Sequence, residues 1–289
     1  MSESKDPTSG KDSAGTAGVR DRSTHAKRGD MREKLFLFGI VSIAAWQPGC
    51  MQVPQAGAED ADRDGEGSAS ADVTIGSFDV GVIPDANLGC PAGSEEIVIR
   101  MDDEDDANGS SQSGWIGKTN SGENGQNTRL YFCRVNGQAF RPFTGTAQAP
   151  DLHDDYAVLK LGALCPPESE EFSRYYDNEN DSNQNWFSGT IFPNMSFDDT
   201  VLSFCLFRYS PSNTVQTVFP SFGSSFHYGV FAPADSDRGL ASGTFTSDDE
   251  DTSNGDGYGV SSDALFAAQR IIQPVNNPGG TLHHVIKAR

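Results

Sequence analysis

Two stretches of this chain have similar sequences, and this similarity restricts the chain to folds built from similar units. "CPAGSEEIVIRMDDED" starts at Cys90 and "CPPESEEFSRYYDNEN" starts at Cys165; both contain Cys-Pro, Ser-Glu-Glu and then an acidic run. The first unit closes with "NTRLYFCR", which contains Cys133, and the second closes with "DTVLSFCLFR", which contains Cys205. The chain therefore contains a tandem repeat with a period of about 75 residues.

A third, shorter unit follows, in which "GTFTSDDEDTSN" supplies the acidic run and "GTLHHVIKAR" supplies the closing strand. Ser236 and Val285 stand near the places of its two cysteines, so both cysteines are missing together. A disulfide inside each unit predicts such a joint absence. Apart from Cys50 the chain has four cysteines, and an even number in an exported chain favours structural disulfides. The expected bonds are Cys90–Cys133 and Cys165–Cys205.

Short segments rich in β-branched and aromatic residues alternate with clusters of Gly, Asn, Asp, Ser and Pro, and several of them, such as "TRLYFCRV" at Thr128, have a period of two. These patterns predict strands. "SSDALFAAQRII" is the one stretch typical of a helix. We therefore expect an all-β fold, a disulfide-stapled β-sandwich built from two to three internal repeats, with one short helix near 262–272.

The N-terminal part has the features of an export signal. From Met31, "MREKLFLFGIVSIAAWQPGC" has a charged start, an apolar run too short to span a bilayer as a stable helix, and a final Gly-Cys pair. It resembles a bacterial lipoprotein signal, and the resemblance implies that Cys50 is lipidated. Secretory cleavage near "AGA" at 56–58 is the alternative.

These features divide the chain into six parts. Residues 1–30 are either upstream of the true start at Met31 or an unusually long charged region before the signal. The expected division is 1–30 disordered or outside the protein, 31–49 signal peptide, 50–72 acidic flexible tether, 73–164 first β repeat, 165–235 second β repeat, and 236–289 a shorter third β repeat packed with the others.

Charge restricts the partners. Residues 50–289 carry 13 Lys and Arg against 35 Asp and Glu, a net charge of −22. Such a surface repels nucleic acid and anionic membranes. Cations, basic proteins and neutral sugars remain as partners, and a membrane enters only through a lipid anchor at Cys50.

The acidic runs share a fixed order of oxygen donors. Aligned on their first aspartate, they are Asp102, Glu104 and Asn108; Asp177, Glu179 and Asn183; and Asp248, Glu250 and Asn254. Carboxylate and carboxamide oxygens suit calcium, and without a cation the neighbouring carboxylates would repel one another. We expect calcium to order these loops, and solvated turns without metal are the alternative.

Aromatic residues follow the runs, and Trp115 and Trp186 are the candidates for ligand contacts, with core packing as the alternative. No HExxH, phosphate loop or dinucleotide fingerprint occurs, so no catalytic residue is assigned. We expect an exported binding module, at the outer membrane or cell surface or secreted, with a protein or glycan ligand. The alternatives are a structural envelope protein with metal-free acidic turns and a secreted hydrolase.

Overall fold

The computed structural model describes residues 75–103, 109–123, 127–143, 154–179, 183–209, 216–236, 238–248, 255–275 and 280–289. Its 15 strands form three successive units of five. The first unit contains β1 (Asp79–Pro84), β2 (Glu96–Met101), β3 (Ser111–Gly114), β4 (Asn120–Glu123) and β5 (Asn127–Asn136), followed by a 3-10 turn, η1 (Gly137–Ala139). The second contains β6 (Tyr156–Lys160), β7 (Glu170–Tyr176), β8 (Trp186–Ser188), β9 (Met195–Ser196) and β10 (Thr200–Phe207). The third contains β11 (Tyr228–Phe231), β12 (Ser242–Ser247), β13 (Gly257–Gly259), α1 (Ser262–Ile271), β14 (Ile272–Pro274) and β15 (Thr281–Lys287).

The same antiparallel pairings occur in each unit. The last strand of a unit (β5, β10 or β15) pairs with the first, second and fourth strands of its own unit. The first strands also pair with one another, β1 with β6 and β11, and β6 with β11. By this pattern β6 and β11 open the second and third units, one strand before positions 165 and 236.

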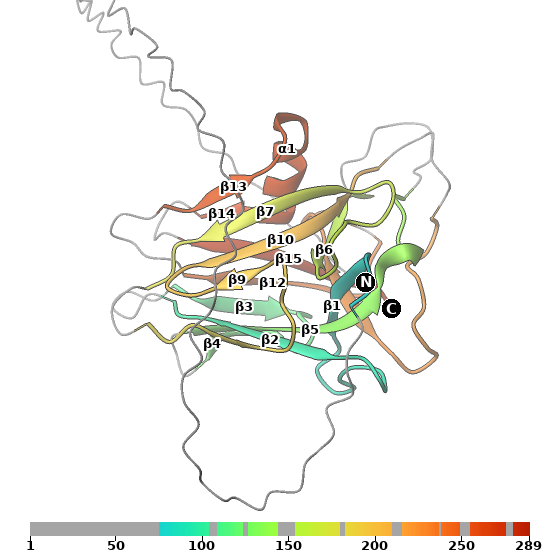
Figure 1. Ribbon diagram of the computed structural model, residues 1–289, viewed down its shortest axis with the longest axis horizontal. Helices are drawn as coiled ribbons and strands as arrows, with labels where there is room; N and C mark the ends of the chain where they lie inside the picture. Colours follow the sequence, from blue (N-terminus) through green and yellow to red (C-terminus); the bar gives the residue numbers. More distant parts are fainter. Residues whose placement is uncertain are drawn as a thin grey trace, which may run out of the picture. The chain divides into compact units, whose positions relative to one another are not determined.

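The third strand of each unit pairs with a different unit. β3 pairs with β12, β8 with β2, and β13 with β7. Each unit therefore contributes one short strand, which we call the lent strand, to the sheet of another unit. This cyclic exchange joins the three units into one continuous sheet. Figure 1 shows the β7–β10 and β2–β5 pairs on opposite sides of the view, with β12 and β15 between them.

The interior contains two hydrophobic clusters. The larger is enclosed by the β2–β5, β7–β10 and β12–β15 pairs and includes Ile99, Phe132, Phe204 and Phe245. α1 closes it through buried residues that include Ala268. The smaller cluster lies around β1, β6 and β11 and is rich in aromatic rings. Alternate residues of β10 belong to different clusters, Phe204 to the larger and Cys205 to the smaller, so this strand is buried on both faces.

The predicted all-β, disulfide-stapled fold with one short helix is confirmed. Cys90 is bonded to Cys133 and Cys165 to Cys205, the two predicted pairs. Among the described residues, no helix is both long and apolar enough to cross a membrane. The export signal, Cys50 and the tether lie outside the described residues.

Candidate functional site

Hydrogen bonds join the three acidic runs into a closed cycle, which we call the ring. The first aspartate of each run uses Oδ2 to accept a hydrogen bond from a backbone N–H of another run. Each donor lies seven residues after the first aspartate of its own run. The pairs are Asp102 with Gln184, at 2.6 Å, Asp177 with Gly255, and Asp248 with Gly109.

A second set of bonds repeats the pattern one residue further on. The backbone N–H of Asp102 donates to Oδ1 of Asn185 at 2.6 Å, and that of Asp177 donates to Oδ1 of Asp256 at 3.0 Å. Hydrogen bonds to ionised carboxylates are the stronger kind, and the first aspartates of all three runs are buried. These carboxylates therefore join the units to one another, a role that accounts for their position in every run.

The predicted metal ligands are only partly described. Glu179 donates its backbone N–H to the carbonyl of Asp102 at 3.0 Å, and Asn183 donates its amide to the carbonyl of Glu179 at 2.9 Å. Within the described part of the chain, no three His, Cys, Asp or Glu side chains gather closely enough to hold a metal ion. The remaining predicted ligands lie outside the described residues: Glu104, Asn108, Glu250 and Asn254.

Asp103 is a site residue that the sequence reasoning did not select. It is fully buried, and its Oδ2 accepts from the hydroxyls of Ser110 and Thr128, both at 2.6 Å. Its other oxygen, Oδ1, has no hydrogen-bond partner among the described residues. Burial, with a contribution from the charge of Asp248, raises the pKa of Asp103 to about 8. The sequence feature that could have identified it is the second position of the aligned runs, which holds Asp103, Asn178 and Asp249.

Directly after the ring, the second unit exposes a run of apolar side chains, which we call the aromatic segment, residues 186–197. Five of its side chains have exposed fractions between 38% and 69%. They are Trp186, Phe187, Phe192, Met195 and Phe197. Exposed apolar residues scattered singly are common, but five within twelve residues are typical of a contact surface.

The first unit provides an internal control for this segment. Ser111 and Trp186 pair with equivalent positions of β12 and β2, which fixes an offset of 75 residues between the two segments. At that offset the first unit has Ser, Gln, Gly, Asn and Gly where the second has the five exposed apolar residues. The same strand geometry is therefore built without these side chains, so the fold itself does not require them.

The aromatic segment is anchored firmly between its exposed residues. Asn185 donates to the carbonyls of Phe197 and Asp198 at 2.7 and 2.8 Å, which ties the end of the segment to its start. Buried Asn194 donates to the carbonyl of Lys160 at 2.8 Å and accepts from the backbone of Ser203 at 2.5 Å. The exposed side chains are thus presented on a backbone that is held in place by hydrogen bonds.

The two tryptophans predicted to contact a ligand differ in placement. Trp186 is exposed, and the guanidinium of Arg129 lies 5.2 Å from its ring centroid. Trp115 is partly buried and packs against the larger core cluster, beside Gly229, where an added Cβ would meet its ring at 2.5 Å. Of the two, Trp186 is the one whose side chain a ligand can reach.

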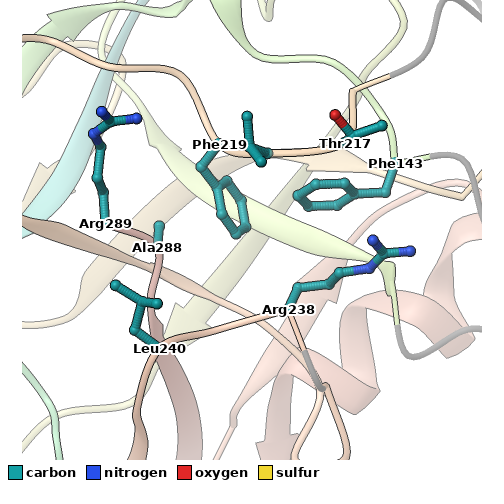
Figure 2. Close-up of a pocket in the computed structure, with 8 residues that line it drawn as sticks. Phe143, Thr217, Phe219, Arg238, Leu240, Ala288 and Arg289 are labelled. Atoms are coloured by element: carbon teal, nitrogen blue, oxygen red, sulfur yellow. The ribbon is translucent and has the colours of Figure 1, made fainter.

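A small apolar pocket of about 260 Å³ lies elsewhere, against the smaller core cluster (Figure 2). Its lining residues are Phe143, Thr217, Val218, Phe219, Arg238, Leu240, Ala288 and Arg289. The guanidinium of Arg238 is bound by both oxygens of Asp154, at 2.6 and 2.9 Å. Among these lining side chains the polar groups are the hydroxyl of Thr217 and the guanidiniums of Arg238 and Arg289.

The larger core also contains a buried cluster of polar side chains. The guanidinium of Arg174 is paired with Asp256, and the hydroxyl of Tyr176 lies 2.9 Å from Nε2 of His283. The ring of His283 stacks on Phe245 with centroids 4.3 Å apart. Burial lowers the pKa of His283 to about 3, so the imidazole is neutral at physiological pH. Because His283 is fully enclosed, substrate has no access to it.

Fold and site together define an all-β, disulfide-stapled domain of three strand-exchanging units that displays one exposed apolar segment. The chain belongs to the bacterial ApeC family, whose model matches residues 67–214. The match includes both disulfides, the first two acidic runs and the whole aromatic segment. No curated protein and no solved structure gives a significant match.

Proposed function

We propose that this chain is an exported, non-enzymatic binding module, attached to the cell surface or secreted, whose protein or glycan ligand contacts the aromatic segment. The observation that carries the proposal is the set of five exposed apolar side chains, which equivalent positions of the first unit lack. Aromatic and methionine side chains are enriched in binding surfaces, and a few of them supply most of the binding energy. Two disulfides support an oxidising location outside the cytoplasm.

Export through the signal at 31–49, with a lipid on Cys50 or cleavage nearby, is part of the proposal. The acidic tether at 50–72 then separates the folded units from the membrane or cell surface. The net charge of −22 keeps the exported chain soluble and directs it away from phosphate-rich surfaces.

The proposal includes calcium at the ring. It is supported by the position of the buried Asp103 carboxyl beside Asp248, because a cation there would stabilise the ionised form of a carboxyl whose pKa is raised by burial. The described side chains do not form a complete calcium cage, so the remaining oxygens would come from Glu104 and Glu250. The metal would stabilise the loops that join β2 to β3 and β12 to β13.

A structural envelope component with metal-free acidic turns is the second candidate. The carboxylate-to-backbone bonds of the ring favour it, because they hold the runs together without an ion. Chelation separates the two: calcium should raise the melting temperature of the chelated protein if it binds the ring. A variant with Glu104→Gln and Glu250→Gln, which removes the charges of two proposed ligands, should lose most of that increase. A melting temperature insensitive to calcium would favour the second candidate.

The binding proposal is tested with a five-serine variant, in which serine replaces each of the five exposed apolar residues of the aromatic segment. A matched control replaces exposed apolar residues elsewhere, Leu88→Ser, Leu164→Ser and Phe266→Ser. Co-sedimentation with isolated bacterial envelopes, which contain both glycans and proteins, measures binding. We expect the five-serine variant to bind roughly tenfold or more weakly than the wild type, and the control to bind normally. Equal binding by all three proteins would contradict the proposal.

A further inference from the structure

We infer that the partner of the aromatic segment is a basic polypeptide with exposed apolar side chains. This inference rests on the proposed function and names the ligand class of the same surface. It follows from the charge around the segment, from the polar groups that the segment has already engaged, and from the kind of apolar side chains it exposes.

The sequence around the aromatic segment is acidic, and the arginines of the first unit that lie beside it, Arg100, Arg129 and Arg134, are each paired with a carboxylate. No lysine or arginine occurs between Arg174 and Arg208, whereas five acidic residues do. Asp198, next to Phe197, is exposed, and Glu179 lies on the ring that leads into the segment. Complementary charge accelerates association and selects against wrong partners, so this surface favours a basic one.

The ring of Trp186 shows how a cation fits here. The guanidinium of Arg129 lies 5.2 Å from the ring centroid and is also paired with Glu123, so one cation already contacts both an indole and a carboxylate. Lysine and arginine of a partner can use the same combination over the face of an exposed ring such as Phe197 and at its neighbour Asp198. Cation–π contacts of this kind contribute about 0.5–1 kcal/mol at exposed sites.

A glycan is a poorer fit, because sugar recognition needs polar groups that are free to bond hydroxyls. The side-chain amides directly before the segment are already engaged with backbone carbonyls. Asn183 donates to the carbonyls of Glu179 and Asp198, and Asn185 donates to those of Phe197 and Asp198. Phe192, Met195 and Phe197 expose apolar atoms, and methionine is common on surfaces that bind polypeptides.

A second copy of this chain is also disfavoured. Self-association through the aromatic segment would bring together two surfaces with the same excess of carboxylates, on chains that each carry a net charge of −22 after the signal. Like charges across an interface oppose association, whereas a basic partner neutralises them. A polypeptide that carries both lysine or arginine and leucine-like side chains satisfies both features of the surface.

The inference is tested by calorimetric titration of the purified chain with four probes: synthetic peptides of alternating leucine and lysine, leucine and glutamate, or serine and lysine, and oligosaccharides of N-acetylglucosamine. The five-serine variant is the key comparison, because it keeps every charge. We expect the leucine–lysine peptide to bind the wild type roughly tenfold or more tightly than the five-serine variant. Asp198→Lys, a change at an exposed site, should also weaken that binding. The leucine–glutamate peptide should not bind.

The other outcomes separate the inference from the proposed function. Equal binding of the leucine–lysine peptide to wild type and five-serine variant would reflect charge alone and overturn the inference. Oligosaccharide binding that the five-serine variant loses would also overturn it, while the proposed binding function would stand. If no probe distinguishes the two proteins and envelope binding is also equal, the proposed function fails together with the inference.

Discussion

Replacing Arg174 by isoleucine tests the equivalence of the three units in the core. In β7, Arg174 occupies the position that Ile99 has in β2 and Phe245 has in β12, since each pairs with the second residue of a lent strand. Arg174 is 1% exposed and pairs with Asp256. At the junction between the first and second units, where Ile99 lies, the residue equivalent to Asp256 is Asn185. The double change Arg174→Ile and Asp256→Asn therefore converts one junction into the composition of another.

The expected magnitudes follow from these contacts. Arg174→Ile alone leaves the largely buried Asp256 carboxylate without its cation and should lower the free energy of unfolding by about 3–5 kcal/mol. The double variant should lose less than about 2 kcal/mol, because the introduced asparagine side chain keeps an amide oxygen that accepts from the backbone of Asp177, as Asn185 does from Asp102. The coupling between the two changes should therefore be at least about 2 kcal/mol.

Urea denaturation of the wild type, both single variants and the double variant measures this coupling through linear extrapolation. Asp256→Asn alone is the matched control, because it leaves Arg174 buried without its counter-charge. The reasoning would be refuted if the two single changes were additive, or if Arg174→Ile alone cost less than about 1 kcal/mol.

Three further predictions concern acid stability, the disulfides and the exposed surface. His283, whose equivalents are Leu130 and Leu202, has a folded-state pKa of about 3, so only the unfolded chain gains a proton as the pH falls from about 6.5. Stability should therefore fall by about 2–3 kcal/mol between pH 7 and pH 4.5 on this account, and His283→Leu should remove that part of the slope in denaturation curves. Replacing Cys90 and Cys133 by alanine should lower the free energy of unfolding by about 4 kcal/mol, since the bond closes a loop of 43 residues; a loss below about 1 kcal/mol would contradict this. The five-serine variant should melt within a few degrees of the wild type, because its changes are at exposed side chains, and a large drop would indicate a structural role instead.

Sequence alone predicted the fold class, both disulfides and the helix. Cysteines and acidic runs are uncommon in sequences, so their recurrence at a fixed spacing marks equivalent positions of the units. The absence of both cysteines from the third unit then indicated which cysteines pair. The strands were recognisable from their β-branched and aromatic residues, as in β5 and β10, although most residues of both strands are buried.

The exchange of third strands could not be predicted. β3 and β13 are short, polar or glycine-rich and lack alternation, and their partners lie in other units, at distances along the chain that no local pattern encodes. The ring followed from that exchange. The aromatic segment, by contrast, could have been found from the sequence. When the first two units are aligned at an offset of 75 residues, Trp186 is equivalent to Ser111 and Phe197 to Gly122.

Hydroxyl-radical footprinting of the purified chain, with and without isolated bacterial envelopes, tests the binding surface most directly. If the aromatic segment is the contact surface, envelopes should reduce oxidation of Trp186, Phe187 and Met195 and leave Leu88 and Phe266 unchanged. Unchanged oxidation along residues 186–197, or equal protection of the control positions, would contradict the account.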